Sequence, residues 1–369
     1  MNIRTVETFV VQSKLTKPFV TALRAVHNVQ SIIVKVTLET GLIGWGEAVP
    51  THVITGETFG SIRYAIDRVL GPVLIGEDVT RREVLFEKVQ RSLLGNTSAK
   101  AAVDMAIHDI LAQQCGLPLV QMLGGYNDRL TTDLTVSVGA PEDMVKEATE
   151  HAAKGFSVLK IKIGTGNFQE ERARIQAIRR EVGPSIVLRL DANQGWKPKE
   201  AIRIIRQLED DGMDIELVEQ PVAANDLEGL REVTKRTDTL IMADESLFSA
   251  ADARRLLEMH AADLLNIKLM KSGGIHEALK INAMAQSYGV ECMTGSMMET
   301  AVGVTAAAHF AASQPNVTRT DLDAPLLLAD VFNCGGIVYK GSVIEFGNGF
   351  GLGFDLNRMQ QWVKERANE

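Results

Sequence analysis

The sequence predicts an α/β protein, a modified (β/α)7β barrel of the TIM type with an N-terminal α+β capping domain. Seven short apolar runs each end in a polar or charged residue, at intervals of about 24 to 29 residues. Helix-length segments separate these runs, which is typical of βα units around a parallel sheet. Three strand-like runs precede the first helical pattern, so the first third of the chain lies outside this rhythm.

Composition and charge are those of a soluble globular protein. The chain has 369 residues, 45% of them hydrophobic and 23% charged, and its net charge is −8. Acidic and basic residues are interspersed, whereas a nucleic-acid footprint would need a basic face. We therefore expect no nucleic-acid partner.

The sequence also lacks the signals of a secreted or membrane protein. Cys115, Cys292 and Cys334 lie too far apart to indicate a disulfide framework or a CxxC metal site. The N-terminus opens on strand-like alternation instead of an apolar signal core. No apolar stretch reaches the length of about 18 residues that a membrane span requires. We expect a cytoplasmic location and no membrane partner.

The capping domain is expected over residues 1–124. Three strands in an antiparallel meander come first, at 3–12, 31–38 and 42–47. Three helical patterns follow, at 60–70, 81–93 and 98–115. The last of these is rich in Ala, Ile and Leu and stops before Gly116-Leu117-Pro118, a helix-ending signal.

The barrel is expected over residues 125–325, and a segment at 326–369 is expected to pack back on the capping domain. The expected barrel strands are 133–138, 158–163, 186–191, 215–219, 240–244, 264–269 and 291–296, with a weaker eighth ending near Asp321 and Asp323. The helices expected between them are 141–154, 169–182, 198–211, 226–236, 250–260 and 274–288. Asp226 and Ser249 are candidate helix N-caps. In the final segment we expect strands at 336–339 and 343–346 and a terminal helix.

Three acids follow apolar runs on three consecutive strands. Asp191, Glu219 and Asp244 are about 28 and 25 residues apart, so they would meet at one mouth of the barrel, where barrel enzymes keep their chemistry. Carboxylate oxygens are ligands that Mg²⁺ prefers, and Mg²⁺ typically keeps room for water or substrate oxygens. No His or Cys stands at a matching position, which argues against Zn²⁺. The plainer alternative for each acid is a helix cap or a lysine partner.

Lysines occupy the ends of two other strands. Lys160 and Lys162 are two residues apart on one strand, so both side chains point the same way. Two ammonium groups so close, and partly desolvated, disfavour each other's charge, which would free a neutral amine to act as a base. Lysines at strand ends can also simply be solvated or paired with acids.

Lys268 ends the sixth strand, which lies roughly opposite the second in an eight-stranded barrel. A substrate carbon at the mouth would have a lysine on each face, so a proton could leave one side and return on the other. Removing a proton next to a carboxylate creates two negative charges on an ene-diolate, which Mg²⁺ would stabilise as a Lewis acid. Lys160, kept protonated, would add a second positive contact. Thr135 and Ser296 are candidate polar contacts to the substrate.

These residues resemble the enolase superfamily, in its muconate-lactonizing subgroup. The resemblance rests on Lys160-Ile161-Lys162, the three acids, Lys268 and three short motifs. Those motifs are Asp191-Ala192-Asn193-Gln194-Gly195-Trp196, Val218-Glu219-Gln220-Pro221 and Met242-Ala243-Asp244-Glu245-Ser246. The resemblance implies the capped, modified barrel and an Mg²⁺-dependent isomerase in which Lys162 and Lys268 exchange protons.

Within that subgroup the chain resembles the dipeptide epimerases, and most the L-Ala-D/L-Glu epimerases. The signals are Asp321-Leu322-Asp323, the runs 267–274 and 295–300, and a capping loop at 16–24. The resemblance implies that Asp321 and Asp323 bind the free ammonium of a dipeptide. It also implies that Arg24, in the loop with Thr21, pairs with a glutamate side chain.

Two other classes of function stay open. A cycloisomerase or an o-succinylbenzoate synthase-type lyase could use the same scaffold, but an acidic pair suits an ammonium and repels a dicarboxylate. A non-catalytic scaffold would be expected to lose site residues, and all three acids and all three lysines are present. The leading hypothesis is an epimerase of small dipeptides in peptidoglycan peptide metabolism. A homo-oligomer is compatible with the sequence.

Overall fold

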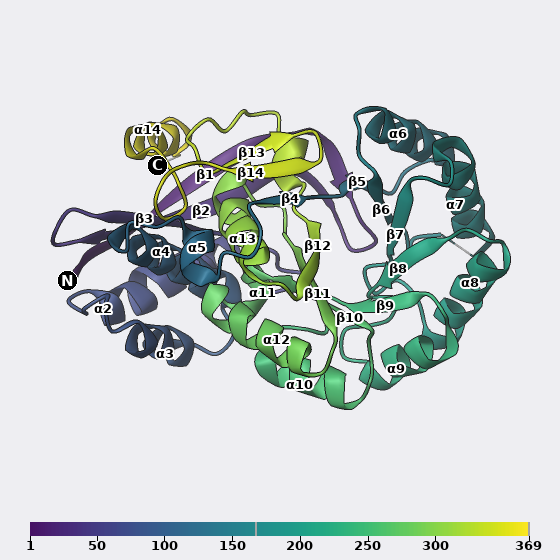
Figure 1. Cartoon of the computed structure of the whole chain (residues 1–369), viewed down its shortest axis with the longest axis horizontal. Helices are drawn as coiled ribbons and strands as arrows, with labels where there is room; N and C mark the ends of the chain where they lie inside the picture. Colours follow the sequence, from purple (N-terminus) through teal and green to yellow (C-terminus); the bar gives the residue numbers. More distant parts are fainter. Residues whose placement is uncertain (167, 368–369) are drawn as a thin grey trace.

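The computed structural model describes residues 1–166 and 168–367, which form a cap and a barrel. A strand-rich cap, dark purple to blue in Figure 1, lies beside a barrel coloured teal to green. The barrel is an eight-stranded parallel sheet with neighbours in the order β12-β11-β10-β9-β8-β7-β6-β5. Both elements of the predicted fold class are therefore confirmed.

The cap begins with a long antiparallel hairpin. Strands β1 (Ile3–Val20) and β2 (Ala25–Leu38) pair along most of their length, and β3 (Ile43–Ala48) pairs with β2. The sequence predicts a first strand that ends at residue 12 and a second that begins at 31, whereas in the structure both extend through the outer half of the hairpin. The reason is local, because Lys14 pairs with Asn28 and the next pair is Phe19 with Val26, so the alternation is broken there.

Helices complete the cap, and α4 makes the most extensive contact with this small sheet. They are α1 (Phe59–Tyr64), the π-helical η1 (Ala65–Leu70), α2 (Gly71–Leu74), α3 (Arg82–Ser92), α4 (Thr97–Gln114) and α5 (Leu119–Leu123). The predicted helices at 60–70, 81–93 and 98–115 match these within about two residues, although the first is a succession of two short elements, α1 and η1, which α2 continues to Leu74. Helix α4 lies so close to β3 that a Cβ at Gly46 would be 1.9 Å from the Ala102 carbonyl oxygen.

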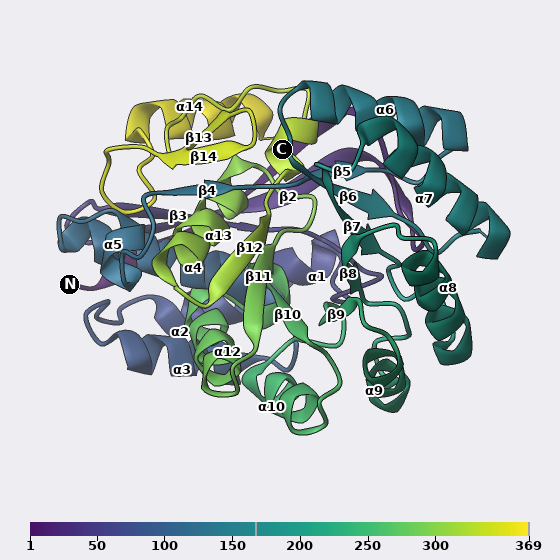
Figure 2. The same ribbon diagram turned by 45° about the vertical axis from the view of Figure 1, so that its right-hand side comes forward.

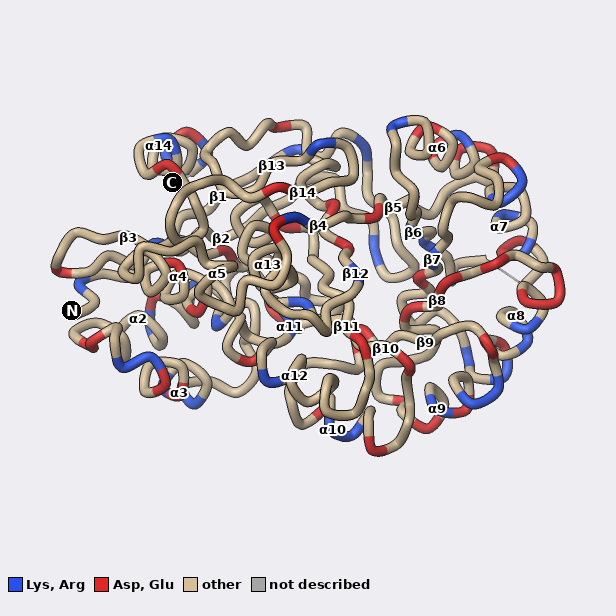
Figure 3. Tube along the Cα trace, viewed as in Figure 1, with Lys and Arg blue, Asp and Glu red and all other residues tan. Residues whose placement is uncertain are grey.

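Barrel strands are short and alternate with outer helices. The strands are β5 (Leu134–Val136), β6 (Val158–Lys162), β7 (Val187–Asp191), β8 (Ile215–Glu219), β9 (Leu240–Ala243), β10 (Leu264–Lys268), β11 (Glu291–Gly295) and β12 (Val317–Asp321). The helices are α6 (Pro141–Ala153), α7 (Phe168–Val182), α8 (Pro198–Asp210), α9 (Leu227–Arg236), α10 (Ala250–Glu258), α11 (Leu269–Ser272), α12 (Ile275–Ser287) and α13 (Ala301–Ser313). In Figure 2 helices α6 to α9 stand outside the strands, and in Figure 3 charges of both signs alternate along them.

Two helices of the barrel begin as the sequence predicted. The Asp226 side chain accepts a hydrogen bond from the Gly229 amide at the start of α9. The Ser249 side chain accepts one from the Asp252 amide at the start of α10. Each cap satisfies an amide that has no partner within its helix.

Side chains and loops close the barrel between its first and last strands. The Thr320 hydroxyl donates to the Thr131 carbonyl at 2.6 Å, and the Leu322 amide donates to the Thr132 hydroxyl at 2.8 Å. The Thr135 amide donates to Asp323 Oδ2 at 2.7 Å. These bonds hold the two edges together where no β5–β12 ladder forms among the described residues.

The C-terminal segment returns across the barrel to the cap. After the 3-10 turn η2 (Ala324–Leu327), strands β13 (Ile337–Lys340) and β14 (Val343–Phe346) form a small sheet with β4 (Arg129–Thr131). Helix α14 (Leu356–Arg366) buries Met359, Trp362 and Val363 in a cluster with Val11 of β1 and Ile33 of β2. No helix in the described part of the chain is long and apolar enough to cross a membrane.

Gly46 should be intolerant of a side chain. Gly46→Ala places a Cβ against backbone that cannot swing away, so we expect a loss of stability of about 1–3 kcal/mol from overpacking. Gly60→Ala, on exposed helix α1 with open space around it, is the matched control and should be neutral or slightly stabilising. Urea unfolding of both variants measures this, and equal midpoints would contradict the close packing of α4 on β3.

Candidate active site

Strand register brings the predicted site residues into one row at the barrel mouth. Lys162 of β6 is level with Asp191 of β7, and Asp191 is level with Glu219 of β8. On the other side, Lys268 of β10 is level with Gly295, which is level with Asp321 of β12. Because parallel strands share one direction, all these side chains stand at the same end of the sheet.

Lys160 and Lys162 point the same way, as predicted, and both contact one acid. The distances from their Nζ atoms to Asp191 Oδ2 are 3.0 and 2.6 Å. Lys160 also lies 2.7 Å from Glu219 Oε2 and 2.7 Å from Asp321 Oδ2. One ammonium group therefore joins three carboxylates.

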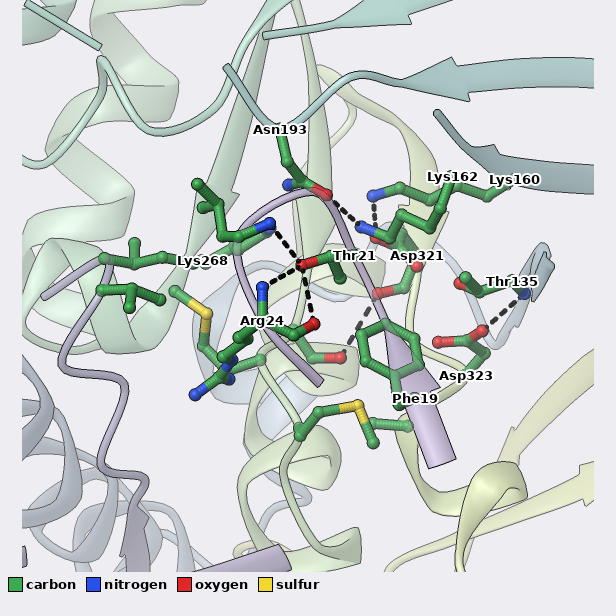
Figure 4. A pocket seen from close by; sticks show the side chains of 17 residues that line it. Phe19, Thr21, Arg24, Thr135, Lys160, Lys162, Asn193, Lys268, Asp321 and Asp323 are labelled. Atoms are coloured by element: carbon green, nitrogen blue, oxygen red, sulfur yellow. Dashed lines mark hydrogen bonds and ion pairs between the residues drawn. The ribbon is translucent and has the colours of Figure 1, made fainter. Parts of the chain in front are cut away.

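Lys268 faces the other side of this acid cluster. Its Nζ is 2.7 Å from Asp244 Oδ2 and 3.8 Å from Glu219 Oε1. Strands β6 and β10 are four positions apart in the eight-stranded sheet, so they lie across the barrel. Figure 4 shows Lys268 and Lys162 entering the pocket from different sides.

The prediction that crowding by Lys162 weakens the charge of Lys160 is wrong in this arrangement. Burial lowers the pKa of Lys160, but the charges of Asp191, Asp321 and Glu219 outweigh it and raise that pKa well above its ordinary value. The pKa of Lys268 is likewise raised, because Asp244 and Glu219 outweigh burial. The neighbouring acids, and not the nearby ammonium group of Lys162, determine the direction in which the pKa of Lys160 is shifted.

The lysines cover the acids and line an open pocket. Asp191, Glu219 and Asp244 are at most 1% exposed and lie beneath the pocket wall. The pocket, of about 570 Å³ including its mouth, is enclosed by both domains. It is lined by Phe19, Thr21, Leu23, Arg24, Val53, Ile54, Thr135, Lys160, Lys162, Asn193, Lys268, Ser296, Met297, Met298, Asp321, Asp323 and Ala324.

The tip of the cap hairpin supplies Arg24 to this pocket (Figure 4). The Thr21 hydroxyl oxygen accepts hydrogen bonds from the amides of Leu23 and Arg24 at 3.1 and 3.3 Å, which shapes the turn. Burial lowers the pKa of the Arg24 guanidinium. Among the described residues it forms no ion pair, although the protein carries an excess of acids. A largely buried guanidinium without an anion is suited to an anionic ligand.

The acidic pair lies on the wall opposite Arg24. Asp323 accepts from the Thr135 amide, and burial with the charge of Asp321 raises its pKa to about 6. Asp321 is bound to Lys160, so only part of its hydrogen-bonding capacity faces the pocket. The Ser296 amide and hydroxyl contact the Asp321 carbonyl at 3.1 and 3.5 Å. The pocket thus has an acidic end and a basic end.

The charge balance of the mouth fits a divalent cation. Acidic groups outnumber basic ones by two among the buried side chains of the mouth, which are Asp191, Glu219, Asp244, Glu245, Asp321 and Asp323 with Lys160, Lys162, Lys268 and Lys271. The pKa of Glu219 is raised to about 7, by burial first and then by the charge of Asp191. In the described ranges no three acidic, His or Cys side chains yet converge as a formed metal site, because the oxygens turn toward the lysines. Asp191, Glu219 and Asp244 are the hard oxygen donors that would hold Mg²⁺.

Several contributors were not singled out from the sequence. Asn193 accepts from Lys162 at 3.2 Å and donates to Glu245 at 3.2 Å, and Lys271 Nζ lies 2.5 Å from Asp244 Oδ1. The Phe19 ring centroid is 5.7 Å from Lys162 Nζ. Asn193 and Glu245 stand in quoted motifs next to predicted ligands, which is the signal that could have found them.

Family models match both parts of the chain. The mandelate racemase/muconate lactonizing enzyme N-terminal domain matches residues 4–124, and the enolase C-terminal domain-like model matches residues 143–360. The chain belongs to the mandelate racemase/muconate lactonizing enzyme family of the enolase superfamily.

Two relatives within this family cover nearly the whole chain. L-Ala-D/L-Glu epimerase of Bacillus subtilis is 56% identical over 96% of both chains, and a substrate-liganded structure of that epimerase matches with a TM-score of 0.95. Hydrophobic dipeptide epimerase of Enterococcus faecalis is 45% identical over 96% of this chain and 99% of its own. A dipeptide epimerase structure from that organism, with Mg and L-Leu-L-Tyr, has a TM-score of 0.92, 44% identity and covers 96% of this chain and 100% of its own.

Mg²⁺ should bind to the acid cluster and stabilise the folded protein. We expect the melting temperature of metal-stripped protein to rise with added Mg²⁺, because a ligand that binds only the folded state stabilises it. Asp244→Asn should lose this rise. Asp238→Asn should keep it, because Asp238 is exposed and precedes β9, at the opposite end of that strand from Asp244. An unchanged Mg²⁺ response in Asp244→Asn, measured by calorimetry, would remove Asp244 from the ligand set.

Proposed function

We propose that this protein is an Mg²⁺-dependent dipeptide epimerase that inverts the C-terminal residue of L-Ala-D/L-Glu. The observation that carries the proposal is a pocket with lysines on two opposed strands, an acidic pair at one end and an unpaired arginine at the other. A dipeptide ending in glutamate has the complementary charges, an ammonium at one end and a side-chain carboxylate at the other. The relatives' activities support the same assignment.

The reaction follows from the charges that the site can hold. Loss of the α-proton turns the substrate carboxylate into an ene-diolate, which carries two negative charges. Mg²⁺, when bound, would supply Lewis-acid stabilisation of that charge. Lys160, fully buried and joined to three acids, stays protonated and adds a fixed positive contact.

Lys162 and Lys268 are the proton carriers in this proposal. Each is more than nine-tenths buried, and each reaches the pocket from its own side. The lysine that is a neutral amine takes the α-proton from one face of the carbon, while the other, as an ammonium group, delivers a proton to the opposite face, so the centre inverts. The roles exchange when the reaction runs backwards. Asp244 and Glu219, when they hold Mg²⁺, would no longer raise the pKa of Lys268.

The ends of the pocket set the substrate class. Asp321 and Asp323 favour a free N-terminal ammonium, and Arg24 favours an acidic C-terminal side chain, through two parallel hydrogen bonds. Thr135 and Ser296 add polar contacts, and Thr21 holds the turn that carries Arg24. We place the enzyme in the cytoplasm, in the metabolism of peptidoglycan peptides.

A hydrophobic-dipeptide epimerase is the second candidate. Leu23, Val53 and Met298 line the pocket near Arg24, and the Enterococcus faecalis relative carries that name. A cycloisomerase or an o-succinylbenzoate synthase-type lyase is less favoured, because the acidic pair would repel a dicarboxylate.

Replacing either proton carrier should stop inversion. Lys162→Ala and Lys268→Ala should each reduce epimerisation of L-Ala-L-Glu below detection, because one face of the carbon loses its base. Each variant should still exchange deuterium from solvent into one stereoisomer, which proton NMR in D₂O measures. A Lys268→Ala enzyme that epimerises at the wild-type rate would rule out the two-lysine assignment.

Arg24 should control the preference for acidic dipeptides. We expect kcat/KM for L-Ala-L-Glu and L-Ala-D-Glu to exceed that for L-Ala-L-Leu and for N-acetyl-glutamate, since discrimination appears in differential transition-state binding. Arg24→Met should reduce this difference in kcat/KM, because it lowers kcat/KM for the dipeptides that end in Glu. Arg63→Met, which changes an exposed residue of the cap, should leave the difference unchanged. Equal kcat/KM for L-Ala-L-Glu and L-Ala-L-Leu in the unmodified enzyme would favour the hydrophobic-dipeptide epimerase.

A further inference from the structure

Two acids are buried together where the cap meets the barrel, away from the lysine cluster. Glu47 lies on β3 of the cap and Glu299 lies in the loop between β11 and α13, and their exposed fractions are 0% and 1%. A Cβ built on Gly303 would be 2.3 Å from Glu299 Oε2 and 3.2 Å from Glu47 Oε2. The two carboxyl groups therefore share the space that the absent side chain of Gly303 leaves.

Glu47 lies against the start of helix α13. It accepts hydrogen bonds from the Thr300 amide and hydroxyl at 2.8 and 2.7 Å and from the Gly303 amide at 2.8 Å. These donors belong to the first turn of the helix, where amides lack internal partners and the helix dipole favours negative charge. Burial raises the pKa of Glu47, and the hydrogen bonds from Thr300 and Gly303 act against that rise. With three donors directed at it, Glu47 is the better stabilised carboxylate of the two.

Glu299 has the opposite environment. Its Oε1 accepts one hydrogen bond, from the Met297 amide at 2.8 Å, and its buried Oε2 has no partner. Burial and the charge of Glu47 raise its pKa to about 8, against the smaller effects of the Met297 amide and Lys268. Tyr339 of β13, whose own pKa is raised by burial and nearby acids, supplies no positive charge. An uncompensated second carboxylate here would be costly, whereas a carboxylic acid would turn its orphan oxygen into a donor.

We propose that Glu299 is a positioning residue that carries a proton at neutral pH and donates it in a hydrogen bond to Glu47. This bond ties the loop to the cap, and the Met297 amide bond passes the constraint to the pocket wall at Ser296–Met298. This wall lines the same pocket as Lys268 and Arg24. The effect of this wall on substrate binding rests on the proposed function, whereas the assignment of the proton to Glu299 does not.

Glutamine substitution separates the two acids. Glu299→Gln keeps a donor in place of the acid proton, so we expect it to fold with a melting temperature no lower than wild type at neutral pH. Glu47→Gln presents an amide to three donors and should melt well below wild type. The reverse order of the two variants would place the proton on Glu47 and overturn the assignment.

The pH dependence of stability tests the proton directly. Between the pKa of an unfolded glutamate, about 4.3, and about 8, the folded protein holds a proton on Glu299 that the unfolded chain has lost. Stability from this group therefore falls as pH rises through that window and levels off above it. At saturating Mg²⁺, we compare the urea concentrations at which half of each protein is unfolded. The midpoint of Glu299→Gln should exceed that of wild type by an amount that increases from pH 5.5 to pH 8. A difference that does not change with pH would contradict the proposal.

The positioning role has its own readouts. Glu299→Ala should speed hydrogen exchange of the Met297 amide, and Glu299→Gln should restore its protection, whatever the substrate is. With L-Ala-L-Glu, Glu299→Ala should raise KM several-fold more than it lowers kcat, and Glu299→Gln should rescue that KM. If no dipeptide is epimerised, the proposed function fails while the midpoint and exchange results still decide the role of Glu299. Unchanged exchange in Glu299→Ala would refute the positioning role.

Discussion

The burial of six acids and four lysines at one barrel mouth is the constraint on which the rest of the structure depends. Isolated charges there would be prohibitively costly. Four of the acids, Asp191, Glu219, Asp244 and Asp321, lie within 4 Å of a lysine ammonium group, whereas Asp323 and Glu245 accept hydrogen bonds from amide groups. Lys160 alone contacts Asp191, Glu219 and Asp321, which come from three strands. The register of the parallel sheet creates these contacts, because it puts the ends of β6, β7 and β8 side by side. The excess of carboxyl groups over lysines makes this mouth suited to a divalent cation.

The cap converts this charged mouth into a selective pocket. Its hairpin is long enough to bring Arg24 to the end opposite the acidic pair, and the Thr21 hydroxyl fixes the turn. The hairpin is anchored at its base, since α4 packs against the glycines of β3 and α14 packs against β1. Glu47 joins the same small sheet to helix α13 of the barrel. The cap, which carries Arg24, is therefore hydrogen-bonded to the barrel, which carries the lysines and the acids.

Periodicity made the barrel and most of its site predictable from sequence. A residue that ends a parallel strand has a defined place, so Asp191, Glu219, Lys162 and Lys268 could be assigned to one mouth without any tertiary information. Side-chain partners could not be read this way. Crowding by Lys162 suggested a weakened charge on Lys160, whereas three acids from other strands raise its pKa instead. The outer half of the hairpin was missed because an irregular pairing interrupts its alternation. The proposed limits of the domains, at residues 124 and 325, stay a prediction.

The central claim is that two lysines on opposite sides of the carbon move different protons. The most direct measurement is the isotopic content of the first product formed from L-Ala-L-Glu by the unmodified enzyme in D₂O. Because the delivering lysine exchanges with solvent and never holds the abstracted proton, the L-Ala-D-Glu formed at early times should carry deuterium at the α-carbon in nearly every molecule. Product that retains the substrate's own proton would mean that a single base returns it, and would contradict the account.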